Sequence, residues 1–152
     1  ASTELQNMVN EWYKSGTECI FSCGGEMCDS VFEAALANNG KSIGVDVDQS
    51  SVSDTVITSA MKGLSSGVQK ILTSFYAGKW VLVGGLSSNL GVDDNAVGLP
   101  FATSKFEKFT ESEYVKLVNS MKSGGTLEVK NDFSAFLAGG ETFENVAVSF
   151  VK

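Results

Sequence analysis

Two aspartates one residue apart, Asp46 and Asp48, follow an apolar stretch that includes Gly44. If a strand continues through both, their side chains point to the same face, because side chains alternate along a strand. A carboxylate there can accept hydrogen bonds from two neighbouring hydroxyls, the arrangement that sugars and riboses present. Three interpretations stay open: a ligand contact, the start of a solvated loop, or a divalent-cation site that has few oxygen ligands beyond Gln49 and Asp54.

Four more residues are candidates for a ligand site beside these carboxylates. Lys62 follows the strand-like run "VITSAM" and is either a solvated lysine or a donor that reaches back toward Asp46. Gly24 and Gly25 end the apolar run "CIFSC", where they form a plain tight turn or let a ligand approach the backbone closely. Phe21 precedes this turn and is either a core residue or a face on which a purine or sugar stacks.

Histidine is absent, and the cysteines are few and close together. Without histidine the chain has no Ser-His or Cys-His nucleophile pair and lacks the commonest general base. Cys19, Cys23 and Cys28 supply three thiols without a fourth ligand nearby, which makes a poor zinc site. We therefore predict no metal and no cofactor, and reduced, partly buried thiols. One disulfide or a reactive thiol is the alternative.

The composition indicates one globular domain. The chain has 152 residues, of which 43% are hydrophobic, with 16 glycines and one proline. Lys and Arg total 11 against 18 Asp and Glu, a formal net charge of −7. Such a balance repels phosphate backbones, so we predict no nucleic-acid partner. No apolar run approaches the length of a membrane span.

Hydrophobic periodicity predicts an α/β fold with a mainly parallel sheet. A strand, a glycine turn, a helix and a strand follow one another within some thirty residues, which is a right-handed βαβ unit. Both "SCGG" and "VDVDQ" lie where strands of this unit end, the usual position of ligand sites in such sheets. We expect helices over residues 2–15, 29–40, 64–76 and 109–125, the last with a capping box at Thr110 and Glu113, and strands over 19–25, 41–48, 55–61, 79–86, 96–101 and 126–132.

Three segments in order carry a resemblance to a known family. They are "GVDVDQS", "VITSAMKGLSSGVQKILTSFYAGKW" and "GGLSSNLGVDDNAVGLPF". Together they resemble the C-terminal half of the basic membrane protein family, the extracytoplasmic substrate-binding lipoproteins of ABC importers that include purine-nucleoside receptors. The likeness extends over about residues 17–101, and residues 105–132 are similar to the closing helix and short strand of that family.

The resemblance implies part of a two-lobed, type I periplasmic-binding-protein fold that closes around its ligand. About residues 1–55 and 79–132 would belong to the C-terminal lobe, and about 56–78 would cross to the other lobe. Residues 133–152 form a tail that the resemblance does not place.

Site residues are implied by the same resemblance. The ribose-binding aspartate of the family falls on Asp46 and its lysine on Lys62. Its glycine turn falls on Gly24 and Gly25, and its aromatic residue on Phe21. The usual alanine-glycine-glycine-threonine-glycine run is replaced here by "GGEMC".

The expected function is solute binding rather than catalysis. A nucleoside-like ligand would be held in the cleft between the lobes, an ABC permease would be the partner, and a lipid anchor outside this chain would tie an extracytoplasmic protein to the membrane. The alternatives are the ligand-sensing lobe of a cytoplasmic regulator and an inactive truncated fragment. A hydrolase that uses the Asp46 and Asp48 pair is a further one, and it needs one carboxyl with a raised pKa.

Overall fold

A four-stranded sheet forms the centre of the computed structural model, which describes residues 1–124 and Ala147. The expected strand over 126–132 lies outside the described residues, as does the tail except for Ala147. The sheet has the order β1-β2-β3-β4, with β1, β2 and β3 parallel and β4 antiparallel to β3. The predicted α/β class with a mainly parallel sheet is confirmed. The strands are β1 (Cys19–Phe21), β2 (Lys41–Asp46), β3 (Val56–Lys62) and β4 (Val97–Gly98).

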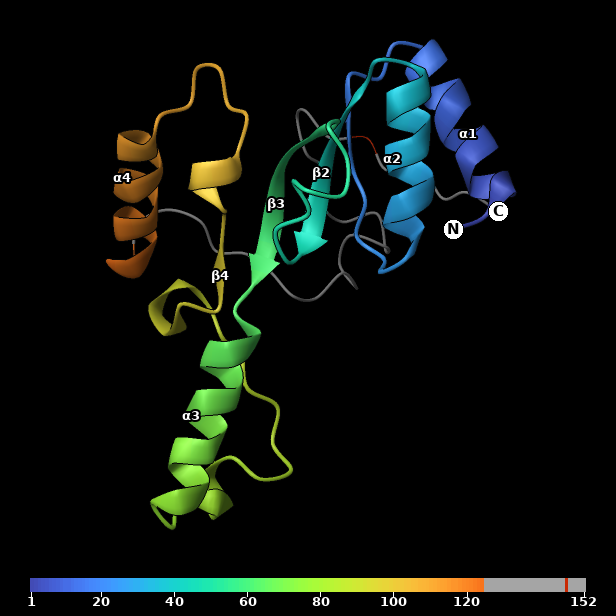
Figure 1. Ribbon diagram of the computed structural model, residues 1–152. Helices are drawn as coiled ribbons and strands as arrows, with labels where there is room; N and C mark the ends of the chain where they lie inside the picture. Colours follow the sequence, from blue (N-terminus) through green and yellow to red (C-terminus); the bar gives the residue numbers. More distant parts are fainter. Residues whose placement is uncertain (125–146, 148–152) are drawn as a thin grey trace.

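Helix α2 packs against the sheet at β2, and α1 packs side by side with α2 (Figure 1). Helix α1 (Thr3–Lys14) begins at Ser2, whose side chain accepts from the Leu5 backbone N–H, and α2 (Met27–Ala37) is the crossover helix between β1 and β2. Val9 and Val31 lie in the core between the two helices, as the periodicity of α1 predicts. Helix α2 begins earlier than expected, because the glycine turn at residues 24–26 leads directly into it.

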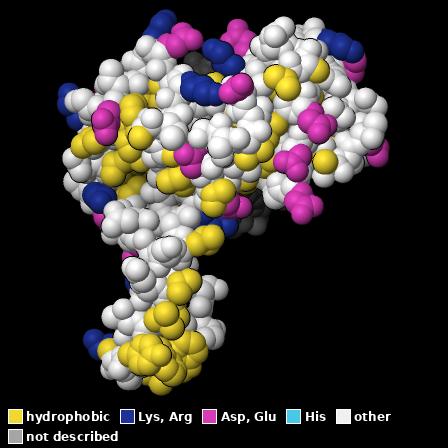
Figure 2. All heavy atoms as spheres, viewed as in Figure 1, with side chains coloured by type: hydrophobic (Ala, Val, Ile, Leu, Met, Phe, Trp, Pro, Cys, Tyr) yellow, Lys and Arg dark blue, Asp and Glu magenta, His cyan; other side chains and the backbone are white. Residues whose placement is uncertain are grey.

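Helix α3 (Leu64–Tyr76) projects away from the sheet (Figure 1). None of its residues is buried, and the space-filling view shows apolar side chains gathered on the projection (Figure 2). The strand expected over residues 79–86 is wrong: Trp80–Leu82 is a 3-10 helix, and Val81 is 81% exposed. The chain turns back at Gly78, with φ +70, and Trp80 meets the edge of Phe75. This turn places the apolar run at residues 79–86 beside α3. Among the described residues, no neighbouring strand is within reach there for the run to pair with.

Helix α4 (Glu111–Lys122) lies on the opposite side of the sheet from α1 and α2 (Figure 1). Its predicted capping box is confirmed, with Thr110 and Glu113 exchanging hydrogen bonds. Tyr114 stacks on Phe101, and its hydroxyl oxygen accepts a hydrogen bond from the Leu99 backbone N–H. The helix thereby holds the segment that follows β4. Within the part of the chain that the structure describes, no helix is long and apolar enough to cross a membrane.

Candidate functional site

A small pocket lies where β2 and β3 end and β4 begins. It has a volume of about 230 Å³ and is lined by residues 46–48, 61–63, 95 and 97–98. Antiparallel pairing sets Lys62 opposite Val97 and Met61 opposite Gly98, so three segments far apart in the sequence meet at one edge of the sheet. This is the carboxyl edge of the parallel strands, the position that the sequence predicts for a ligand site.

Asp46 and Lys62 line this pocket together, on neighbouring strands. The Lys62 ammonium lies 3.1 Å from a carboxylate oxygen of Asp46, and both side chains are about half exposed, at 61% and 45%. An ion pair this exposed contributes little to stability, because water competes for both charges. It presents a donor and an acceptor next to each other on an open surface, which suits a ligand that carries neighbouring hydroxyls.

The backbone of Asp46 is in an unusual conformation. Its φ is +67, in the left-handed region, and the Val47 N–H donates to the Val45 carbonyl oxygen at 2.8 Å across it. A hydrogen bond between residues i and i+2 with positive φ at the centre marks the rarer and more strained kind of γ-turn. Backbone strain of this kind persists where surrounding contacts hold it, often at ligand sites. The turn ends β2 at Asp46, so no strand continues through Asp48.

Asp48 also lines the pocket, but its carboxylate is engaged within the protein. One oxygen accepts from the Thr103 hydroxyl at 2.7 Å, and the other accepts from the Ser50 backbone N–H at 3.0 Å. The hydrogen bond from Thr103, with those from Ser50, lowers the pKa of Asp48 below its ordinary value. Asp48 is therefore a local turn residue that ties the loop after β2 to the short 3-10 helix Phe101–Thr103.

Asn95 lines the pocket too, and sequence reasoning missed it. It has φ +52, so two of the three non-glycine residues with positive φ among the described residues lie at this pocket. Its side-chain oxygen is 3.5 Å from the Lys122 ammonium on α4. The backbone of Asn95 also passes close to Gly63. A Cβ at Gly63 would lie 2.3 Å from the Asn95 carbonyl oxygen, so only glycine leaves room for it. An asparagine followed by the short run "AVGLP" is the signal that could have indicated a left-handed turn before β4.

Phe21, Gly24 and Gly25 are not among the residues that line this pocket. Phe21 is the last residue of β1, is 49% exposed and pairs with Ile43, three residues before Asp46. Gly25 has φ +59, which explains a glycine at this turn, and a Cβ at Gly24 would collide with the Met27 side chain. A ligand role for all three remains a prediction.

The three cysteines are free thiols with different environments. Cys28 is buried, where it accepts a hydrogen bond from the Ser22 hydroxyl at 3.2 Å, whereas Cys19 is half-buried and Cys23 is exposed. Burial raises the pKa of the Cys19 thiol. Across residues 1–124, no three Cys, Asp or Glu side chains are grouped so that they could hold a metal ion.

A parallel sheet with a pocket at the carboxyl ends of its strands is the architecture of α/β ligand-binding domains. Residues 3–131 match the model of the family described as ABC transporter substrate-binding protein PnrA-like, and the chain belongs to this Bmp family. The family predicted from the sequence is thereby confirmed. Over 124 residues the chain is 31% identical to "Basic membrane protein D" of Borreliella burgdorferi (strain JD1), covering 78% of this chain and 36% of that protein.

A solved structure supports the fold. The chain superposes with a TM-score of 0.57 and 21% identity on the crystal structure of a transcriptional activator of the comK gene from Bacillus halodurans, covering 80% of this chain and 41% of that one. At this identity the likeness shows the fold alone. The chain spans well under half the length of both relatives.

Proposed function

We propose that this chain forms part of the solute-binding component of an ABC importer and that it binds a nucleoside or a related small polar ligand. The observation that carries the proposal is the half-exposed Asp46–Lys62 ion pair, whose two residues line a pocket. Asp46 would accept hydrogen bonds from two ribose hydroxyls, and Lys62 would donate to one of their oxygens. Membership of a substrate-binding family supports this role.

The pocket supports a ligand site that is completed by a second lobe. About 230 Å³ is less than the volume that enclosed small-molecule sites offer, roughly 300 Å³ or more. Residues 1–55 and 79–132 would form one lobe, and residues 56–78 would cross to the other. Within residues 56–78, β3 still pairs with β2 in the sheet, so the crossing would be made by the projecting α3. Ligand binding would then close the two lobes on each other, and an ABC permease would accept the loaded protein. The working protein would be extracytoplasmic, held by a lipid anchor outside this chain.

Binding without turnover is the proposed mode of action. A carboxylate pair would need one protonated member to act as an acid, and the lowered pKa of Asp48 opposes this role. Incubation of the protein with adenosine and inosine, followed by chromatography, should return both nucleosides intact. Release of free base would contradict this part of the proposal.

The proposal is tested by thermal unfolding of the protein expressed from its complete gene, with inosine, adenosine, ribose and amino acids as probes. A ligand at a hundredfold its Kd stabilises the folded state by about 2.7 kcal/mol, which raises the Tm by several degrees. Asp46→Asn keeps the shape and the tolerance for positive φ but removes the charge, so it should abolish the nucleoside-induced shift.

Asp93→Asn is the matched control, because Asp93 is exposed and does not line the pocket. It should respond to nucleosides as the unmodified protein does. A Tm shift that survives Asp46→Asn, or no shift with any nucleoside, would contradict the proposed ligand contact.

A further inference from the structure

Gln49 lies folded back over strand β2, three residues after Asp46. Its side-chain amide oxygen accepts a hydrogen bond from the Val45 backbone N–H at 2.8 Å, and its own backbone N–H donates to the Ser59 hydroxyl at 3.0 Å. Ser59 is fully buried on β3. Gln49 is therefore tied at two points, to the strand that carries Asp46 and to the neighbouring strand.

Gly44 provides the space for this arrangement. A Cβ at Gly44 would lie 2.6 Å from the Ser59 hydroxyl oxygen and 2.7 Å from the Gln49 amide oxygen. Both distances are too short for any residue other than glycine unless the neighbours shift. The glycine in "IGVDVDQ" thus has a specific role: it lets Gln49 reach the backbone next to Asp46.

The hydrogen bond to Val45 replaces one that a sheet neighbour would otherwise make. Lys41 N–H donates to Glu18 on the β1 side, and Val45, four residues on, faces the same side because alternate residues of a strand do so. Strand β1 ends at Phe21, opposite Ile43, so it does not extend as far as Val45. The Gln49 side chain satisfies the N–H that the end of β1 leaves without a strand partner.

We propose that Gln49 is a positioning residue for Asp46. Its side chain accepts the hydrogen bond from the Val45 N–H and thereby maintains the γ-turn that directs the Asp46 carboxylate toward Lys62. The hydrogen bond to Ser59 and the space at Gly44 hold Gln49 in place for this contact. Val45 is one end of that turn, since its carbonyl oxygen accepts from Val47 across Asp46. Without Gln49, the strained φ of +67 at Asp46 would relax toward an extended conformation. The carboxylate would then leave its place 3.1 Å from Lys62. This inference rests on the proposed role of Asp46 in ligand binding.

The first test concerns the turn and needs no ligand. Gln49→Met keeps the length of the side chain but removes the acceptor, whereas Gln49→Glu keeps an acceptor oxygen. In NMR spectra of the ligand-free protein, Gln49→Met should speed amide exchange at Val45 and shift the Asp46 Cα resonance away from its positive-φ position. Gln49→Glu should preserve both signals. Unchanged Val45 and Asp46 signals in Gln49→Met would overturn the proposal.

The second test concerns binding, with inosine as the probe. Losing one well-placed hydrogen bond to the turn should weaken inosine binding about tenfold in Gln49→Met, with partial recovery in Gln49→Glu. Gln69→Met is the control: Gln69 is exposed on α3 and should change nothing. Equal affinity in Gln49→Met and the unmodified protein would overturn the proposal. If inosine does not bind the unmodified protein, the proposed function fails, while the NMR result still decides the role of Gln49 in the turn.

Ser59→Ala tests the second contact of Gln49, the hydrogen bond from its backbone N–H to the Ser59 hydroxyl. It also keeps the proposal testable if a Gln49 variant does not fold. It removes the acceptor for the Gln49 backbone N–H without adding volume, and it should weaken inosine binding in the same direction. A normal turn signal at Asp46 in folded Ser59→Ala would contradict the part of the proposal that assigns an anchor to Ser59.

Discussion

At the residue scale, two aspartates that look equivalent in sequence have separate roles. The residue types of Asp46 and Lys62, and their places at the ends of strands, predicted that both belong to a ligand site. The structure brings the two side chains together. Alternation along a continuous strand would have aimed Asp48 the same way. The γ-turn at Asp46 interrupts that alternation, and it depends on contacts from Gln49 and Ser59 that only the folded chain brings together.

The stability of the fold at acid pH should depend on the hydrogen bonds that Asp48 accepts. Because folding lowers the pKa of Asp48, its contribution to stability is present above the ordinary aspartate value near 3.8 and is lost as the pH falls through the lower folded value. Thr103→Val removes the main hydrogen bond, so the Asp48 pKa should rise toward its ordinary value. NMR titration of the Asp48 carboxyl measures this change directly, and an unaltered pKa would refute the assigned cause.

Thiol reactivity should follow exposure. The exposed Cys23 should react first with iodoacetamide, Cys19 more slowly because burial raises its pKa, and the buried Cys28 only on unfolding. Mass spectrometry of peptides from a timed reaction establishes the order. Early labelling of Cys28 would show that the packing of α2 against the sheet is looser than described.

At the scale of elements, sequence patterns succeeded where local contacts decide the structure. The periodicity of α1, the βαβ unit and the capping box of α4 are set by residues a few positions apart, and all three are confirmed. The run "KWVLVGGL" failed, because a strand also needs a partner with which to pair. Its composition is typical of a buried strand. The turn at Gly78, which places the run beside α3, becomes visible in the folded structure.

Tyr13 links α1 to the sheet and gives a test of that packing. Its hydroxyl donates to the Lys41 carbonyl oxygen at 2.7 Å, and burial raises the pKa of Tyr13 to about 12. A raised pKa stabilises the fold fully below pH 10, and this contribution is lost between about pH 10 and about pH 12. Tyr13→Phe should cost about 1 kcal/mol at neutral pH.

Between about pH 10 and about pH 12, the free energy of unfolding of Tyr13→Phe should fall less steeply than that of the unmodified protein, because Phe cannot ionise. Denaturant unfolding monitored by circular dichroism from pH 7 to about pH 12 compares the two proteins. Equal steepness in both would contradict the assignment of the alkaline loss to Tyr13.

At the scale of the whole molecule, α3 and the turn after it carry an apolar surface with little to cover it. Such a large exposed patch is typical of a surface that meets another part of a protein. We define the α3 apolar surface by its exposed side chains, which are Leu64, Val68, Leu72, Phe75, Trp80, Val81 and Leu82. No local sequence pattern could reveal this exposure, because apolar residues at helical spacing are equally typical of a helix face buried in a core.

The 152-residue chain on its own should therefore bind a hydrophobic dye and self-associate through this surface. Replacing Val68 and Leu72 by Ser should lower dye fluorescence and shift sedimentation toward the monomer, since these residues lie on the exposed face of α3. Leu117→Ser, at an exposed position on α4, serves as the control and should have a smaller effect. Equal changes in both proteins would show that the α3 apolar surface has no special part in association.

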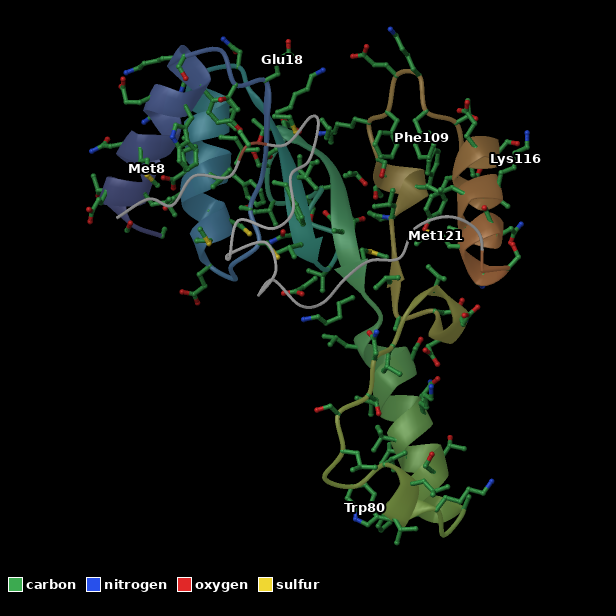
Figure 3. All side chains as sticks on the ribbon, turned by 180° about the vertical axis from the view of Figure 1, so that it is seen from behind. Met8, Glu18, Trp80, Phe109, Lys116 and Met121 are labelled. Carbon is green, nitrogen blue, oxygen red and sulfur yellow. The ribbon has the colours of Figure 1, made fainter. Side chains whose placement is uncertain are left out.

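The projection of α3 also gives the molecule two well-separated optical reporters. The sequence contains two tryptophans: Trp12 lies in α1, which packs on α2, and Trp80 lies at the far end of the projection (Figure 3). With Trp12 replaced by Phe, the emission of the protein would come from Trp80 alone. Its wavelength would then register whether the tip of α3 faces water or another surface, so the environment of this distant helix can be followed in solution without any added label.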